Sequence, residues 1–334
     1  MLLAFRVKSL VIVVVAIIAV IGGAFAYMGW GSDIRGEIVA EEVQQPTIEP
    51  TPEEEEDFIR WAQFDVGYDL LVKAYNLDVK SIGEAVRLNW IELLAYGVSR
   101  NYGNVGGNAD NKKVAGHIDE AVGRLRGGKT MEEIVDGVKY YGFYYEVYSA
   151  ILGGFLRDGE LQVFSPIPKG RHFSHYDDFG NARGYGYQRR HMGNDLIGEV
   201  GTPIIAVERG VIEVMGWNQY GGHRIGIRSE CGLRYWYYAH LREPRPFHGS
   251  LSEGMVIEAG EVIGYLGRSG YSATEGANNI ATPHLHLGLQ LIFDESQKEG
   301  VNQIWVNVYH IVRFLNKNRS EVVRDDATRE WNRR

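Results

Sequence analysis

The sequence has 334 residues, 45% of them hydrophobic, which is enough for about two ordinary domains with buried cores. The 43 acidic residues outnumber the 35 lysines and arginines, and the net charge of −8 argues against a nucleic-acid-binding surface. Cys231 is the only cysteine, which excludes an intrachain disulfide and a cysteine-ligated zinc site, so any metal ion needs histidine and carboxylate ligands.

The N-terminal segment predicts a membrane helix. Residues 10–28 carry no charge, are long enough to span a bilayer and follow two basic residues. We therefore expect residues 1–30 to form a cytoplasmic stub and a single-pass signal anchor, with the rest of the chain extracytoplasmic. Ala24 and Ala26 form an A-x-A pattern, so secretion after signal cleavage near Ala26 is the alternative. We favour the anchor because the apolar run exceeds the ~7–15 residues of a signal-peptide core.

The next segment, residues 31–56, contains three prolines and many glutamates without apolar periodicity. It predicts a solvated, self-repelling linker.

Residues 57–157 predict a small all-α domain of unassigned role. Thr130 and Glu133 form a capping box, and apolar residues continue from there at helical steps as far as Tyr148, so we expect one continuous helix that ends near Gly153. Five tyrosines lie in 140–148. We expect them to fill a small core, with a binding face as the alternative, and an extracytoplasmic protein partner is possible for this domain.

From residue 160 to 317, short β-forming runs alternate with glycine, and turn signals recur every 8–12 residues. This pattern predicts an all-β sandwich or barrel, and hence an α+β multidomain chain. The tail, residues 318–334, is highly charged, and we expect it to fray.

The β region carries a histidine pair in the stretch PHLH. Side chains alternate faces along a strand, so His284 and His286 project together while Leu285 and Leu287 face the core. Two imidazoles on one face can share a metal ion, or one can bind metal while the other acts on a substrate. The pattern alone is weak, because two half-exposed histidines on a strand are common.

Three more polar residues strengthen this signal. His191 and Asp195 are four apart in HMGND, and the apolar neighbours of Asp195 would make a buried carboxylate there costly without a cation. His240 ends the β-forming run YWYYAH. Two histidines and one carboxylate leave one tetrahedral position open, which is the ligand pattern of a catalytic zinc site. Two further histidines remain for acid–base chemistry.

The order H-x-x-x-D, A-H-L and P-H-L-H resembles the lysostaphin-like, LytM-type zinc endopeptidases that cut peptidoglycan peptides. DDFGNARGYG (177–186), GTPIIAVERGVIEVMGW (201–217) and EAGEVIGYLGRSG (258–270) are similar to further motifs of that family. The resemblance covers residues 165–292 or so. It implies a duplicated-hybrid-motif, barrel-sandwich peptidase domain within residues 160–317.

The resemblance also implies roles for individual residues. His191, Asp195 and His286 would bind one Zn²⁺ ion, and His240 and His284 would be catalytic, one of them taking a proton from the attacking water. Tyr185 matches a position where family members can carry a tyrosine near the substrate oxyanion. The expected function is thus that of a membrane-anchored extracytoplasmic zinc endopeptidase, a hydrolase acting on cross-links or stem peptides of peptidoglycan in wall remodelling, sporulation or division.

Some features depart from the family pattern or leave alternatives open. Leu287 and Gly288 follow HLH where an aromatic residue and a glutamate are common, which predicts looser packing behind the site. Arg183, Arg189 and Arg190 either meet a peptide carboxylate or line a solvated loop. A catalytically silent LytM-type module that holds a cell-wall or membrane-protein partner is the main rival function. A lipoyl- or biotinyl-type carrier fits less well, because the hairpin lacks an exposed lysine.

Overall fold

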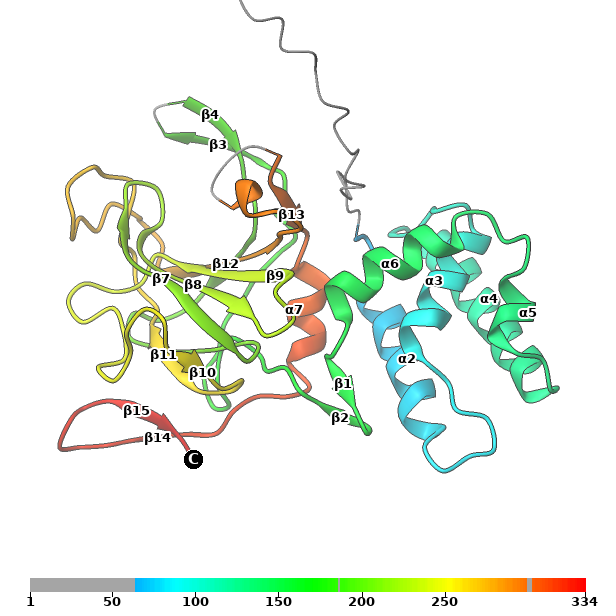
Figure 1. The fold of residues 1–334 in the computed structure, drawn as a ribbon. Helices are drawn as coiled ribbons and strands as arrows, with labels where there is room; N and C mark the ends of the chain where they lie inside the picture. Colours follow the sequence, from blue (N-terminus) through cyan, green and yellow to red (C-terminus); the bar gives the residue numbers. More distant parts are fainter. Residues whose placement is uncertain (1–63, 186, 299–301) are drawn as a thin grey trace, which may run out of the picture. The chain divides into compact units, whose positions relative to one another are not determined.

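The computed structural model describes residues 64–185, 187–298 and 302–334, all within one compact unit, Asp57–Arg334 (Figure 1). The expected membrane helix over residues 10–28 and the linker over residues 31–56 lie outside the described residues. Within the described part, no helix combines the length and apolar character needed to cross a membrane.

Five helices form the N-terminal part of the described chain. They are α2 (Tyr68–Lys80), α3 (Trp90–Arg100), α4 (Asn108–Arg126), α5 (Met131–Val135) and α6 (Tyr141–Leu152). The central helix is α3, which packs against α2, α4 and α6 and is buried along most of its length. The side chain of Asn89 caps it by accepting hydrogen bonds from the backbone N–H groups of Ile91 and Glu92.

The predicted helix from Thr130 through Tyr148 is wrong in one respect, because it is two helices. The capping box of Thr130 and Glu133 is present and opens α5, but this helix ends at Val135. Gly137 and Tyr140 then both take positive φ angles, +69° and +68°, which a right-handed helix cannot contain. The second helix, α6, stops before Gly153 as expected.

The remainder is rich in strands and confirms the sheet-based fold expected of residues 160–317. One sheet has the order β10-β7-β8-β9-β12-β13, with β5 also pairing with β12. Its strands are β5 (Asn194–Ile197), β7 (Gly210–Asn218), β8 (Gly222–Ser229), β9 (Arg234–Ala239), β10 (Val256–Ile257), β12 (His284–Leu291) and β13 (Ile304–Val306). Two-stranded pairs are β1 (Leu156–Arg157) with β2 (Glu160–Leu161), β3 (Ala182–Tyr185) with β4 (Tyr187–Arg190), and β6 (Pro203–Ile205) with β11 (Val262–Tyr265).

Strand β12 is the hub of the sheet because it has partner strands along both of its edges. Its first four residues pair with β5, and its last six pair with β9, all antiparallel. In this register His286 lies opposite Asp195 on one side and Ala239 on the other. Leu285 and Leu287 are fully buried, so the alternation predicted from the sequence holds.

A short helix, α7 (Tyr309–Leu315), joins the strands to the helices and was not expected from the sequence. Its Phe314 is fully buried and stacks on Trp90 of α3 at 5.7 Å between ring centroids. The ring of Tyr75 on α2 meets Phe314 edge-on at 5.4 Å. Helices and sheet therefore share one continuous hydrophobic core.

The charged tail was expected to fray, and this prediction is wrong. It contains an antiparallel pair, β14 (Val322–Arg324) and β15 (Trp331–Arg333), after the 3₁₀ helix η1 (Glu295–Gln297) and α7. Tyr265 of β11 donates a hydrogen bond to the carboxylate of Glu330, and its oxygen accepts one from the backbone of Trp331 at 3.2 Å. These long-range contacts hold the tail against the sheet.

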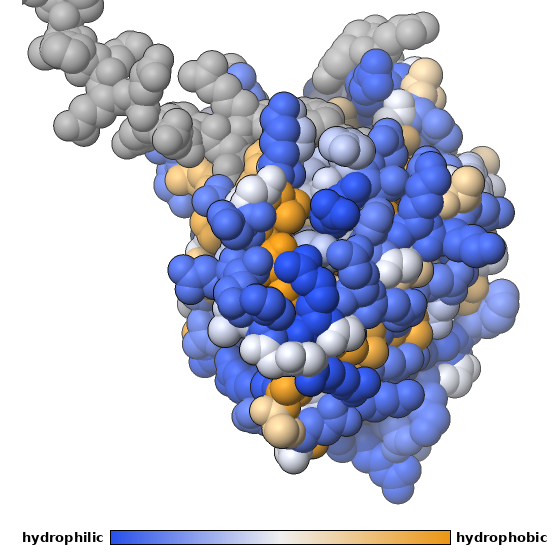
Figure 2. All heavy atoms as spheres, turned by 90° about the vertical axis from the view of Figure 1, so that its right-hand side faces the viewer, coloured by the Kyte–Doolittle hydropathy of each residue, from blue (hydrophilic) through white to orange (hydrophobic). Residues whose placement is uncertain are grey.

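The surface seen from the helical side is mostly hydrophilic (Figure 2). Hydrophobic side chains appear there in small, separate patches rather than as one broad apolar face. This is ordinary for a surface in contact with water.

Candidate metal and catalytic site

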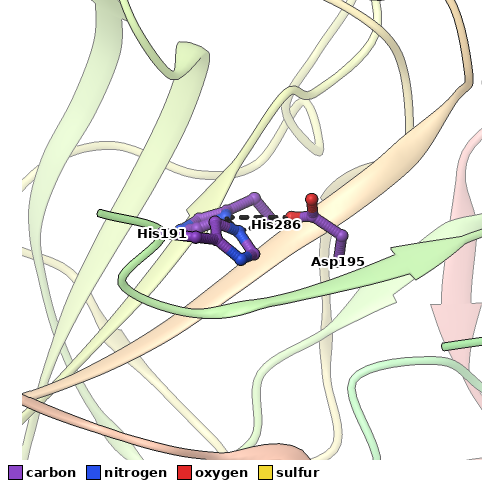
Figure 3. A group of neighbouring side chains, drawn as sticks. All are labelled: His191, Asp195 and His286. Carbon is purple, nitrogen blue, oxygen red and sulfur yellow. Dashed lines mark hydrogen bonds and ion pairs between the residues drawn. The ribbon is translucent and has the colours of Figure 1, made fainter. Parts of the chain in front are cut away.

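Three side chains predicted as metal ligands meet at one point on the sheet (Figure 3). His191 follows β4, Asp195 lies on β5 and His286 lies on β12. His191 Nε2 is 2.8 Å from His286 Nδ1 and 2.9 Å from Asp195 Oδ1, and His286 Nδ1 is 3.0 Å from the same oxygen. The pairing of β5 with β12 brings Asp195 and His286 together.

A glycine permits this close approach. A Cβ atom on Gly193 would lie 2.6 Å from both the His286 ring and the carbonyl oxygen of Leu287. Real Cβ atoms do not tolerate such contacts, so the turn between His191 and β5 needs glycine to lie against β12.

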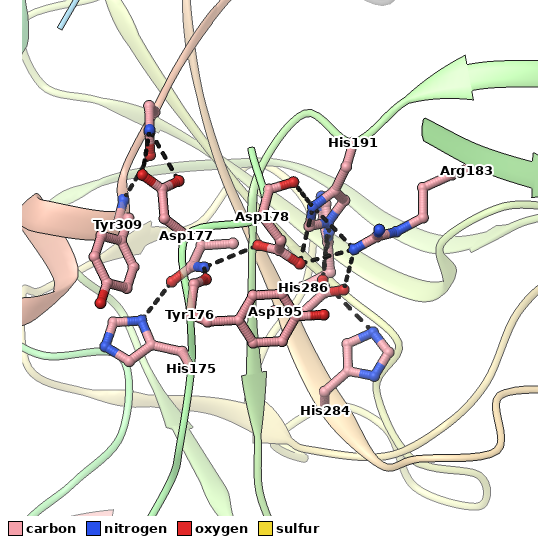
Figure 4. Close-up of polar contacts among 12 residues, drawn as sticks. His175, Tyr176, Asp177, Asp178, Arg183, His191, Asp195, His284, His286 and Tyr309 are labelled. Atoms are coloured by element: carbon pink, nitrogen blue, oxygen red, sulfur yellow. Dashed lines mark hydrogen bonds and ion pairs between the residues drawn. The ribbon is translucent and has the colours of Figure 1, made fainter. Parts of the chain in front are cut away.

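The ring of His191 is oriented by groups behind it (Figure 4). Its Nδ1 donates to the backbone carbonyl of Asp178 at 3.1 Å and lies 3.2 Å from the Asp178 carboxylate. In the neutral ring, Nε2 therefore carries a lone pair, which is directed at Asp195 and His286. Arg183 donates to Asp178 at 2.7 Å and to Asp195 at 3.3 Å.

A further layer holds Asp178 itself. Asn194 donates to the Asp178 carboxylate at 3.0 Å and to the carbonyl of Tyr176 at 2.7 Å, and it accepts from His175 at 2.6 Å. Asp178 and Asn194 are fully buried. The network in Figure 4 therefore fixes His191 from the interior.

The pKa shifts of His191, Asp195 and His286 fit a site that holds a cation. Burial would lower the pKa of His191, but hydrogen bonds to the carboxylates of Asp178 and Asp195 outweigh it and raise that pKa to about 9. Burial would raise the pKa of Asp195, yet hydrogen bonds from His191 and His286 hold it well below its usual range. Burial keeps the pKa of His286 below its ordinary value.

The two predicted catalytic histidines lie next to this cluster. The rings of His240 and His284 are 4.9 Å apart, and His240 is 5.8 Å from the ring of His286. His240 is buried, and burial together with the neighbouring imidazoles His284 and His286 pushes its pKa well below the usual value, so its ring is neutral. His284 Nε2 lies 3.6 Å from Asp195 Oδ1.

Backbone carbonyls set the tautomers of both rings. His240 Nδ1 donates to the carbonyl of Ser269 at 3.0 Å, and His284 Nδ1 donates to that of Thr282 at 2.8 Å. Since a carbonyl only accepts, each neutral ring presents an unprotonated Nε2. His240 also has a positive φ of +64°, rare for a residue other than glycine and common at functional sites.

The donor set fits a zinc ion. Two imidazole nitrogens and one carboxylate oxygen, all within 4.8 Å of one another, match the three protein ligands of a catalytic zinc site with an open fourth position. Without a cation, His191 must carry a proton to offset two carboxylates, as its raised pKa indicates.

The other predicted residues have mixed outcomes. Tyr185 lies at the end of β3, and its side chain is outside the described part. Arg183 contacts the acidic residues of the cluster, so it is not a simple solvated loop residue. Arg189 lies over the rings of Tyr220 at 5.2 Å and Tyr271 at 5.1 Å, and the Tyr271 ring is 5.7 Å from that of His240.

The predicted loose packing behind the site is wrong. Leu287 is fully buried, and a Cβ atom on Gly288 would lie 2.6 Å from the ring of Trp305. The tryptophan of β13 therefore fills the space that a larger residue at 288 would occupy.

Sequence reasoning missed Asp178, Asn194 and Ser269. The first two carry a usable signal, because short polar residues beside the motif histidine are natural partners for its second nitrogen. Ser269 acts through its backbone carbonyl, which leaves no signal in residue type.

Comparison with known proteins agrees with this geometry. Residues 189–302 match the sequence pattern of peptidase family M23. An L-Ala–D-Glu endopeptidase of Bacillus subtilis is 40% identical over 124 residues, which cover 37% of this chain and 36% of that protein. Lysostaphin of Staphylococcus simulans is 33% identical over 113 residues, which cover 31% of this chain and 20% of lysostaphin. The chain thus spans about a third or less of the length of these relatives.

A solved structure shares the fold over a longer stretch. The crystal structure of a protein from Ruminococcus gnavus, described as a glycyl-glycine endopeptidase LytM, superposes with a TM-score of 0.52 at 24% identity. The match covers 79% of this chain and 92% of that one. The histidine and aspartate cluster, the strands that carry it and the matched segment together identify residues 189–302 as a domain of peptidase family M23.

Proposed function

We propose that this protein is a zinc endopeptidase that hydrolyses peptide bonds of peptidoglycan. The observation that carries the proposal is the convergence of His191, Asp195 and His286 beside two further histidines, His240 and His284. Three relatives, an L-Ala–D-Glu endopeptidase, lysostaphin and a glycyl-glycine endopeptidase, are at least 33% identical over the matched segment.

The residues divide the chemistry between them. A zinc ion held by the three-residue cluster would polarise the scissile carbonyl and acidify water. His240 and His284 each offer an unprotonated Nε2, so either can accept a proton from the attacking water and later return it to the leaving amine. Burial lowers the pKa of His240 well below its usual value and keeps its ring unprotonated near neutral pH.

The test uses the full chain purified in detergent and incubated with peptidoglycan. We expect loss of cross-linked or stem peptides that stops with a chelator, resumes with zinc and is absent in His284→Ala. His248→Ala is the matched control, because His248 lies on a surface loop and bonds Ser250. Stoichiometric zinc without cleavage of any wall type would favour the catalytically silent binding module.

We further propose that the cleaved peptide carries a carboxylate close to the scissile bond. The guanidinium of Arg189 lies 5.2 Å from the ring of Tyr220 and 5.1 Å from that of Tyr271. Among the described residues, its buried Nε has no hydrogen-bond partner, and it forms no ion pair with a carboxylate. A guanidinium in such a position recognises a carboxylate through two parallel hydrogen bonds. This supports a bond such as L-Ala–D-Glu, the one named for the Bacillus subtilis relative, over Gly–Gly.

Matched synthetic peptides test the substrate class. Arg189→Gln should raise KM for a stem peptide with a free D-Glu α-carboxylate and leave KM for the α-amide peptide unchanged. Equal KM values of the unmodified enzyme for the two peptides would contradict the role of Arg189.

The location of the protein is also a proposal. We infer from residues 10–28 that the protein is anchored in the cell membrane with its enzyme domain outside. Protease treatment of intact cells should digest the domain, and N-terminal sequencing of the mature protein distinguishes the anchor from cleavage near Ala26.

A further inference from the structure

A second pocket lies in the helical part, lined by the segment after α3 and by residues around the start of α6. It has a volume of about 630 Å³ and includes no residue of the candidate metal and catalytic site. Its lining consists of Tyr102, Gly103, Asn104, Val105, Tyr140, Phe143 and Tyr144.

Two of the lining tyrosines are held in a backbone conformation that tyrosine avoids. Tyr102 has a φ of +54° and Tyr140 a φ of +68°, both in the left-handed region. Their exposed fractions are 79% and 49%, so burial of the rings does not repay the strain. Strained, exposed aromatic residues that face one pocket point to a binding role.

The residues beneath the exposed rings are tightly packed. A Cβ atom on Gly103 would lie 2.1 Å from the hydroxyl of Tyr144, so only glycine lets this ring lie against the backbone. Phe143 meets Tyr144 edge-on at 5.2 Å, and Tyr144 contacts the buried Tyr148 at 5.7 Å. The pocket is thereby connected to the hydrophobic core and is preorganised.

The chemistry of the lining selects a neutral ligand. None of the seven lining residues carries a formal charge, although 23% of the chain is charged. Lys139 lies 4.6 Å from the Tyr140 ring centroid and is engaged there as a cation–π partner. A nucleic acid or another polyanion would need several free cations in the wall of the pocket.

Sugar rings match such a wall. A pyranose has C–H faces that stack on the electron-rich faces of tyrosine and phenylalanine, and a hydroxyl rim that bonds phenol and amide groups. Tyr102, Tyr140 and Phe143 supply the faces. The side-chain NH2 of the exposed Asn104 donates to the carbonyl of Asn101 at 3.0 Å, which leaves its amide oxygen as an acceptor for a sugar hydroxyl.

We propose that this pocket binds the N-acetylated glycan strand of the cell wall. The identity of the glycan rests on the proposed function, while binding itself does not depend on the metal site. The helical part then serves as a wall-binding element, and the tyrosine-rich segment 140–148 combines core residues such as Tyr148 with a binding face.

The test measures binding of a tetramer of β-1,4-linked N-acetylglucosamine to the full chain in detergent, with the metal removed by a chelator. Asparagine adopts the left-handed region readily, so Tyr102→Asn and Tyr140→Asn should keep or raise the melting temperature. Each should weaken glycan binding at least tenfold. Tyr145→Ala is the matched control, since Tyr145 is an exposed tyrosine of α6 outside the pocket, and it should bind normally.

Three results would overturn the proposal. They are absence of binding to both the tetramer and peptide-free glycan strands, unchanged binding in both asparagine variants, or a fall in melting temperature that accounts for the lost binding. A chain that binds the tetramer but cleaves no wall peptide would contradict the enzyme function alone. Capture of an extracytoplasmic protein without glycan binding is a case of the first of these results.

Discussion

Asp178 connects the interior of the protein to His191, the proposed metal ligand. Its backbone carbonyl accepts a hydrogen bond from His191 Nδ1, and its carboxylate lies 3.2 Å from the same nitrogen. The carboxylate also accepts hydrogen bonds from Arg183 and Asn194, and the side chain is fully buried. A carboxylate in this position fixes the tautomer of the ligand and increases its basicity.

We predict that Asp178→Asn weakens zinc affinity roughly 10–100-fold, since the ring of His191 loses its charged partner. Competition with a chromogenic chelator measures the change. Asp177→Asn is the matched control, because Asp177 is exposed, accepts a hydrogen bond from Asn307 at 3.1 Å and should leave the affinity unchanged when substituted. Equal effects of the two substitutions would contradict the role of Asp178.

The raised pKa of His191 makes zinc binding a proton-release reaction. With a pKa of about 9, His191 is protonated at pH 7 in the metal-free protein, whereas a ligand imidazole must be neutral. His286 has a lowered pKa and is already neutral there. Zinc affinity should therefore rise about tenfold per pH unit from pH 7 toward 9 and level off above it.

Calorimetric titration with zinc in buffers of different ionisation enthalpy checks this expectation. We expect release of about one proton per zinc ion at pH 7 and much less above pH 9. A binding enthalpy that is independent of the buffer at pH 7 would show that His191 is neutral before zinc binds.

The turn into β5 decides whether the ligands converge. We predict that Gly193→Ala pushes β5 away from β12, lowers the free energy of unfolding by about 1–3 kcal/mol and abolishes stoichiometric zinc binding. Thermal unfolding and metal analysis measure both effects. Gly184→Ala on β3 is the control, because a Cβ atom there meets nothing within 4 Å.

Local sequence patterns predicted the strands and the candidate metal ligands. They did not predict the break between α5 and α6 or the contacts between residues far apart in the sequence. The alternation around His284 and His286 follows from strand geometry, and β12 has it. The division between α5 and α6 was missed because the apolar steps continue across Gly137 and Tyr140, whose left-handed φ angles no apolar pattern encodes. Ser269 and the Trp305 ring contribute through folding in three dimensions, so residue type and spacing do not reveal them.

At the scale of the whole molecule, α7 makes the helices and the sheet parts of one core. Arg234 of β9 adds a polar connection, since it donates to the backbone carbonyl of Ala150 in α6 at 2.9 Å and pairs with Glu208. The sequence predicted a frayed tail and a separate helical domain because contacts between residues far apart in the sequence leave no local pattern.

We predict that Phe314→Ala lowers the free energy of unfolding by about 3–5 kcal/mol and keeps a single transition. Loss of helix, followed by circular dichroism, and loss of bound zinc should have the same midpoint. Val323→Ala, at an exposed position on β14, should change stability by less than about 0.5 kcal/mol. Two separate transitions in the unmodified protein would show that helices and sheet unfold independently.

The shared core also has a kinetic consequence for a polymeric substrate. A chain that holds a strand of the wall through its helices presents the strand's peptides to the site on β12 at a high effective concentration, without any new contact at that site. Because α7 fixes the helices to the sheet, only peptides within one fixed reach gain this advantage. The rate of peptide cleavage in intact wall should then exceed the rate for soluble peptide fragments. Such fragments carry no glycan strand for the pocket to hold, so their local concentration at the site is not raised.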